Sequence, residues 1–120
     1  MAIEYDNLTI ANGVFEEDTK IETVTVPDGG LKRGSLLGKI TATSKYVLSL
    51  GTATDGSENP KRLLYEDVKN DTGSDVDNDL LTYNAGTFGD LGVVYGTGQT
   101  MQNTYDSLDA VNIRILEGRM

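Results

Sequence analysis

The 120-residue chain contains no cysteine, no histidine and no tryptophan. Without the first two, no disulfide can form, and cysteine–histidine catalytic pairs, Ser-His-Asp triads and ordinary zinc sites are excluded. Basic residues are also scarce, since 10 Lys and Arg stand against 19 Asp and Glu, for a formal net charge of −9. Binding to nucleic acid or to an anionic membrane surface is therefore disfavoured, because each needs a basic patch.

Long apolar runs are missing as well. No window approaches the length of a membrane-spanning helix, and Met1-Ala2-Ile3-Glu4 begins neither a basic nor an apolar segment, so we expect no secretory signal. Hydrophobic residues make up 38% of the chain, and there are 14 glycines. A modest core with many glycines is typical of one turn-rich β domain that draws part of its stability from a partner.

The most regular stretch is residues 31–50, LKRGSLLGKITATSKYVLSL, which predicts two strands folded back on each other. Period-two alternation in this stretch places one set of side chains on a buried face and the other on an exposed face. Thr43 and Ser44 occupy the turn. Gly34 and Gly38 fall in the first strand, where glycine marks a bulge, a bend or another backbone passing close by. We expect a bent hairpin at the centre of the core.

The segment before it, residues 14–26, also reads as a strand, but neither of its faces is cleanly apolar. Such a strand has no obvious place in a core, so it is expected to be an exposed edge or an arm that pairs with another chain. The turn sequence Pro27-Asp28-Gly29-Gly30 then interrupts it. We therefore divide the chain into an extended N-terminal arm, residues 1–26, and a compact β-rich body, residues 27–120.

Beyond the hairpin, short strands alternate with polar loops. Strands are predicted at residues 62–68, at residues 80–88 with a bend at 84–86, and at residues 112–116, while 70–79 reads as a solvated acidic loop. The sequence at 103–110, NTYDSLDA, predicts the one helix. Asn103 or Thr104 would cap it, with Asp106 in its first turn. The predicted fold class is mainly β, a β-rich α+β fold with one short C-terminal helix.

No motif in the chain indicates a catalytic, cofactor or metal site. Residues 34–39, GSLLGK, lack the spacing and the following Ser or Thr of a phosphate-binding loop. The acidic loop lacks the glycine and the closing glutamate of an EF-hand, so an opportunistic cation site is only a lesser alternative to a solvated loop. An enzyme would have to work with Asp, Glu, Tyr, Lys or Ser alone, so we expect no enzyme and no cofactor.

Four segments, in their order and spacing, resemble the head decoration proteins of tailed bacteriophages, the lambda protein D family. They span most of the body and read LKRGSLLGK at 31–39, LLYEDV at 63–68, YNAGTF at 83–88 and LDAVNI at 108–113. In the last segment this chain has Asp109 and Asn112 where family members commonly have a basic residue and a glycine. These differences concern the local contacts of the helix.

The resemblance implies a compact β-rich body that forms a homotrimer, is made in the host cytoplasm and becomes part of the virion. The trimer would sit outside the expanded head at three-fold and quasi-three-fold positions and hold the major capsid protein subunits together against DNA pressure. In this family the N-terminal arm makes much of the shell contact. Here that role falls on five residues of the predicted edge strand: Ile21, Thr23, Val24, Thr25 and Val26.

This interpretation predicts that removing residues 1–26 abolishes capsid binding and leaves the body folded. Strand addition to a capsid subunit would then pair the backbone of the arm and bury Val24 and Val26. A second hypothesis, of a different class, is a β module that binds a ligand such as a sugar. That hypothesis predicts a concave pocket with exposed tyrosines.

Overall fold

The computed structural model describes residues 15–117 and is dominated by strands. Its composition, 43% strand with one short helix and 12% helical residues, confirms the predicted fold class. In chain order the elements are β2 (Phe15–Val26), β3 (Leu36–Lys39), β4 (Tyr46–Leu48), β5 (Pro60–Leu64), β6 (Val76–Gly89), the 3-10 turn η2 (Asp90–Gly92), α1 (Met101–Asp109) and β7 (Ile113–Leu116).

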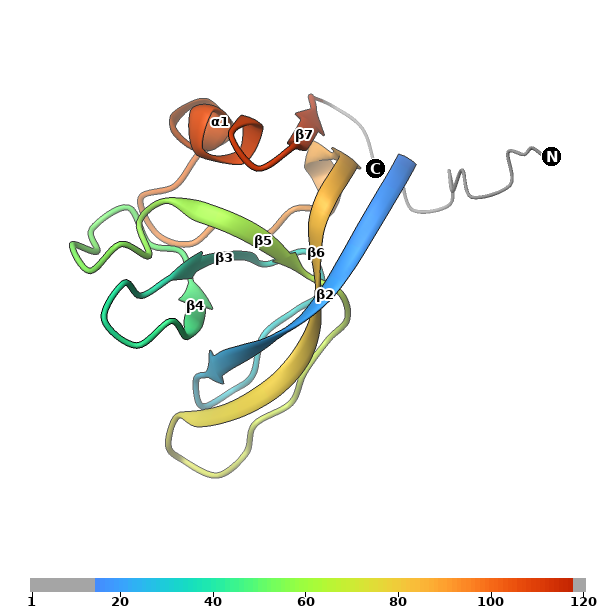
Figure 1. Ribbon diagram of the computed structural model, residues 1–120. Coiled ribbons are helices and arrows are strands. Elements are labelled where there is room, and N and C mark those ends of the chain that lie inside the picture. The colour runs from blue at the N-terminus through green and yellow to red at the C-terminus, as the bar shows by residue number, and fades with distance from the viewer. Residues whose placement is uncertain (1–14, 118–120) are drawn as a thin grey trace, which may run out of the picture.

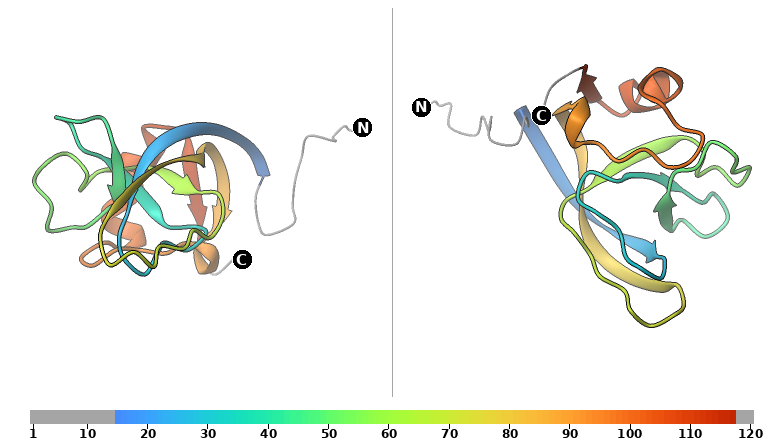
Figure 2. Two further views of the ribbon diagram at one scale, coloured as in Figure 1. Left: turned by 90° about the horizontal axis from the view of Figure 1, so that it is seen from below. Right: turned by 180° about the vertical axis from the view of Figure 1, so that it is seen from behind.

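Five of the strands close into a barrel. Their order is β2-β4-β3-β5-β6, and β2 returns to pair with β6. The β2–β4 pair is parallel, and the other pairs within the barrel are antiparallel. The sixth strand, β7, pairs in parallel with β6 outside the ring. It lies beside α1 at one end of the barrel, while β2 and β6 run together as a long ribbon (Figures 1 and 2).

The hairpin predicted at residues 31–50 is confirmed. β3 pairs with β4 from Leu37 opposite Leu48 to Lys39 opposite Tyr46. Ser44 has a positive φ of 62° in the turn. Gly38 marks the close passage of another backbone, because a Cβ atom at this position would lie 1.9 Å from the carbonyl oxygen of Ser57.

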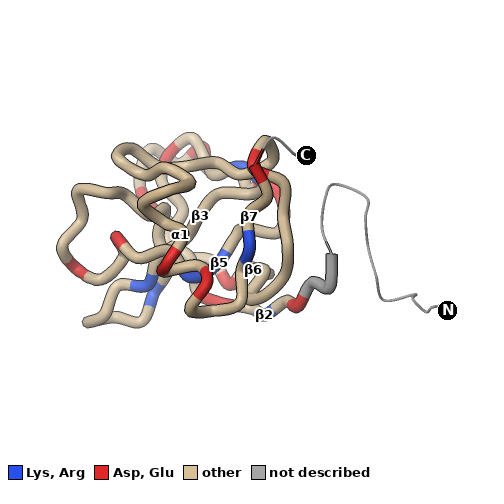
Figure 3. The backbone as a smooth tube through the Cα atoms, turned by 90° about the horizontal axis from the view of Figure 1, so that it is seen from above, with Lys and Arg blue, Asp and Glu red and all other residues tan. Residues whose placement is uncertain are grey.

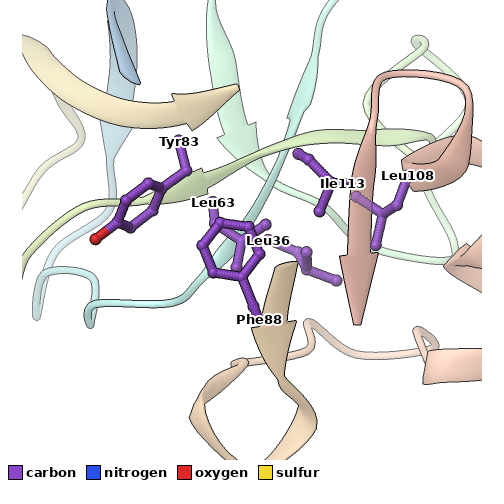
Figure 4. Close-up of a cluster of buried hydrophobic side chains, with 6 residues drawn as sticks. All are labelled: Leu36, Leu63, Tyr83, Phe88, Leu108 and Ile113. Carbon is purple, nitrogen blue, oxygen red and sulfur yellow. The ribbon is translucent and has the colours of Figure 1, made fainter. Parts of the chain in front are cut away.

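Both faces of this hairpin's first strand are covered, contrary to the expected exposed face. Leu36 and Leu37 are neighbours in sequence, and each has no exposed surface. Leu37 belongs to an inner cluster, made of Val24, Val26, Leu31, Leu37, Tyr46 and Leu64. Leu36 belongs to an outer cluster, made of Leu36, Leu63, Tyr83, Phe88, Leu108 and Ile113, in which α1 and β7 cover the outside of the barrel (Figure 4).

The expectation that residues 14–26 lack a place in the core is wrong. β2 pairs with β6 along its whole length, in continuous register from Thr19 opposite Tyr83 to Val26 opposite Val76. Val24 and Val26 are fully buried in the inner cluster. Residues 15–26 thus form one wall of the barrel, and residues 1–14 of the predicted arm lie outside the described residues.

The acidic stretch is shorter as a loop than its composition predicts. Residues 76–79 continue into β6, because they pair with residues 23–26 of β2. The predicted bend at 84–86 falls at Gly86, whose φ is 141°, within the strongly curved β6 (Figure 1). Acidic side chains indicate solvent exposure, and they do not show whether the backbone that carries them is part of a sheet.

The helix begins two residues earlier than predicted, at Met101. Thr100 is its N-cap, not Asn103 or Thr104, and Asn103 completes a capping box in which each side chain accepts from the other residue's backbone N–H. Asp106 consequently lies beyond the first turn. Leu108 on the inner side of α1 is buried in the outer cluster, while Tyr105 is half exposed.

Candidate functional site

The outward face of the β2–β6 ribbon carries three of the five residues predicted to bind a partner. Ile21 is 64% exposed, the most exposed large apolar side chain that the structure describes. Thr23 and Thr25 follow on the same face and donate hydrogen bonds to Asp79, at 2.8 Å, and Asp77, at 2.7 Å. Val24 and Val26 point into the barrel, so they are not available to a partner.

One edge of β2 is open. β6 covers one side of this strand, whereas β4 meets the other side only where Val24 lies opposite Tyr46. Among residues 15–117, no strand pairs with the edge of residues 18–22 that faces away from β6. Unpaired backbone N–H and C=O groups of this kind can take up a strand from another chain.

A polar cluster lies across three barrel strands close to this open edge. Arg62 of β5 donates to the Glu22 carboxylate at 3.0 Å, and its guanidinium lies 5.2 Å from the centre of the Tyr46 ring. Burial raises the pKa of the Tyr46 hydroxyl; the Arg62 charge opposes this effect and the Glu22 charge adds to it. The cluster therefore ties β2 to β4 and β5 at the point where β2 leaves the inner cluster.

Two carboxylates of the acidic stretch, both on β6, accept hydrogen bonds from neighbouring side chains. Asp77 accepts hydrogen bonds from Lys45 and Thr25, and both of these bonds lower the pKa of its carboxyl, that from Lys45 more strongly. Asp79 accepts from Thr23. Among residues 15–117, no three carboxylates gather closely enough to hold a metal ion. The strand geometry separates side chains that composition alone would have grouped.

The surface hollows of the described chain include two that are lined by strand and loop residues. The first, of about 360 Å³, is mainly apolar, and we call it the apolar hollow; its lining is Thr25, Pro27, Ile40, Val47, Leu48, Leu50, Ala53, Asp55, Ser57 and Asp75. The second, of about 330 Å³, lies where β6 meets β7 and the end of α1. Neither is lined by a tyrosine, as the sugar-binding hypothesis would require. The sequence did not reveal the apolar hollow, because its residues read as ordinary strand and loop positions.

The two departures in the last segment of the resemblance have separate structural settings. Asn112 follows α1 with a positive φ of 65°, and its carbonyl accepts from the N–H of Gly86 at 3.0 Å. Asparagine tolerates this left-handed conformation better than most residues other than glycine, which accounts for Asn at a glycine position. Asp109, the last residue of α1, is exposed at the negative end of the helix, where a basic residue would be more favourable.

Charge and hydropathy give no indication of a membrane or nucleic-acid surface in the described part of the chain. Acidic positions occur all round the backbone, with fewer basic ones among them (Figure 3). Within residues 15–117, no helix is long and apolar enough to cross a membrane. The open edge of β2, the exposed Ile21 and the apolar hollow are features that suit a protein partner.

Comparison with known families gives a match that covers most of the chain. The sequence model of the family described as bacteriophage lambda head decoration protein D matches residues 6–113. This range contains all four segments on which the resemblance rests, and it runs from before β2 to the first residue of β7. No curated protein matches the chain.

Proposed function

Because the chain belongs to the bacteriophage lambda head decoration protein D family, we propose that it binds the outside of the expanded phage head as a homotrimer and stabilises the shell against DNA pressure. Proteins of this family are structural components of the virion capsid, not enzymes. Family membership also implies that the partner is the major capsid protein. The match over residues 6–113 is the observation that carries the proposal.

In this proposal the shell contact is made by the outward side of β2 and its open edge. A strand of the capsid subunit pairs with the backbone of residues 18–22 and covers Ile21, the most exposed large apolar side chain of the described residues. Thr23 and Thr25 continue the same face. Val24 and Val26 support this surface from inside the barrel instead of touching the shell.

Placement at three-fold and quasi-three-fold positions suits contacts that are individually weak. Each trimer presents the same strand edge three times, so binding of one copy raises the effective concentration of the other two at their sites. Each chain carries a net charge of −9, so trimers repel one another in solution, and binding to the capsid offsets this repulsion on the shell. Stabilisation of the shell then follows because each trimer connects neighbouring capsid subunits.

The test mixes the purified protein with expanded, undecorated capsids of its own phage and images them by electron cryomicroscopy. We expect trimeric density at the three-fold positions, with β2 against the shell. Bare capsids at saturating protein would reject the proposal, and the alternative of a ligand-binding β module would then be tested by ligand screening.

The role of β2 is tested with Ile21→Asn, and Leu91→Asn is the matched control because Leu91 is 62% exposed on η2. We expect Ile21→Asn to weaken capsid binding roughly tenfold, as loss of a central apolar contact does, and the control to bind normally. Equal binding by both variants would remove Ile21 from the contact.

A further inference from the structure

The apolar hollow lies where β2 ends, away from the open edge of residues 18–22 and from Ile21. Its apolar floor consists of Pro27 and of four side chains on or next to the β3–β4 hairpin, Ile40, Val47, Leu48 and Leu50. These four are half-buried, so the chain itself covers them only in part. A volume of about 360 Å³ is near the lower limit of small-molecule sites, roughly 300–1,000 Å³, and it suits one or two side chains of a partner.

Two carboxylates flank this floor. Asp55 accepts hydrogen bonds from the N–H and the hydroxyl of Ser57, at 3.0 and 2.6 Å, and these bonds lower the pKa of its carboxyl, so it is ionised at neutral pH. Asp75 is exposed and makes no ion pair with any residue that the structure describes. Lys45, the lysine next to β4, is already paired with Asp77. An apolar floor beside two uncompensated carboxylates is complementary to an apolar side chain with a cation next to it.

We propose that the apolar hollow binds a segment of the capsid shell in which an apolar side chain is flanked by Lys or Arg. The apolar side chain occupies the floor formed by Ile40 and Val47, and the cation pairs with Asp75 and Asp55. The two carboxylates disfavour an acidic segment as the occupant, because like charges repel. The inference rests on the proposed function and gives each copy a second contact, at the end of β2 beyond Ile21.

The experiment measures the affinity of variants for expanded, undecorated capsids at low and high salt. In Val47→Thr the shape is kept and a hydroxyl is placed on the apolar floor; we expect about tenfold weaker binding at both salt concentrations. In Asp75→Lys the charge beside the hollow is reversed; we expect about tenfold weaker binding at low salt and a smaller loss at high salt, because salt screens exposed charges.

Each variant has a matched control elsewhere on the surface. Val94→Thr makes the same change at a residue that is 36% exposed, and Asp71→Lys reverses an exposed charge in the same loop as Asp75 without lining the hollow. Both controls should bind capsids like the parent protein. Thermal unfolding of all four variants checks that the differences in affinity do not come from loss of the fold.

Three outcomes contradict the inference, and they are distinguishable. If the parent protein itself does not bind capsids, the proposed function fails and the inference fails with it. If the parent binds and both hollow variants bind equally well, the shell contact is elsewhere and only the inference fails. If Val47→Thr instead lowers the mass of the protein in sedimentation without capsids, the hollow is an interface between copies of this chain.

Discussion

Leu63 and Leu64 are neighbours on β5, yet they belong to two different cores. Leu64 lies in the inner cluster, which the barrel strands enclose and to which β2 contributes two valines. Leu63 lies in the outer cluster, which α1 and β7 cover and to which none of the described side chains of β2, residues 18–26, belongs. The comparison shows that the N-terminal strand and the C-terminal helix stabilise opposite faces of the same strands.

Within β2, the residues that stabilise the fold are different from those proposed to contact the shell. Even-numbered Val24 and Val26 belong to the inner cluster, whereas odd-numbered Ile21, Thr23 and Thr25 face outward. Because side chains of a strand alternate between its faces, one strand can close a barrel and still present a surface to the shell. A deletion cannot remove one role and keep the other, but point substitutions can.

The largest expected effect is that of deleting residues 1–26. The deletion removes β2, and with it the closure of the barrel and two fully buried valines, so we expect no cooperatively folded protein. This reverses the expectation that the body folds without the arm. Circular dichroism and thermal unfolding of the truncated protein provide the measurement.

Deleting residues 1–14 is the control, since it keeps every strand described here. We expect the protein that lacks residues 1–14 to unfold cooperatively. A cooperative transition in the protein lacking residues 1–26 would show instead that the remaining barrel strands close without β2.

The next largest effect is expected from substitutions on β5, which contributes one leucine to each cluster. Leu63→Ala and Leu64→Ala each remove a buried leucine, and each is expected to lower the free energy of unfolding by about 2–5 kcal/mol. We expect Leu64→Ala to be nearer the upper value, because a closed barrel relaxes less around a cavity than a cluster covered by a nine-residue helix. Chemical denaturation measures both free energies of unfolding. If either substitution had almost no effect, only one face of β5 would contribute to stability, as simple alternation predicts.

The sequence predicted the elements of this fold better than their burial. The hairpin at 31–50, the short C-terminal helix and the last strand are all present, because turn residues and apolar spacing are local signals. Burial of both Leu36 and Leu37 had no such signal, since it depends on which distant elements cover each face. For the same reason β2 resembled an arm: its partner, β6, begins 50 residues after it ends.

The proposed site was predictable only in part. Exposure of Ile21 follows from its place in the alternation, and the family resemblance directed attention to that strand. The apolar hollow depends on how Pro27, the hairpin and the loop at 51–57 meet in space, and no local pattern encodes that meeting. The same holds for the cluster of Arg62, Glu22 and Tyr46, whose members are far apart in sequence.

Two ion pairs, from Glu22 of β2 to Arg62 and from Asp77 of β6 to Lys45, allow the same comparison with smaller effects. Glu22→Gln removes the negative charge that is paired with Arg62, whose Nε is already buried without a hydrogen bond to any described group, so we expect a loss of about 1–3 kcal/mol. Asp77→Asn removes the negative charge that is paired with Lys45, and we expect a smaller loss, because exposed ion pairs contribute little to stability. Denaturation at low and high salt measures both, and equal losses would mean that the partial burial of Arg62 has no energetic consequence.

The smallest effect concerns the link between α1 and β7 that covers the outer cluster. Asn112→Gly relieves the positive φ and is expected to change the free energy of unfolding by less than about 1 kcal/mol, whereas Asn112→Ala should lower it by about 1 kcal/mol. Both keep the backbone hydrogen bond to Gly86. In Asn112→Ala, amide hydrogen exchange should quicken at Leu108 and Ile113 but not at Leu64, because only the cover of the outer cluster is strained. Equal acceleration at Leu64 would show that the two clusters unfold as one unit.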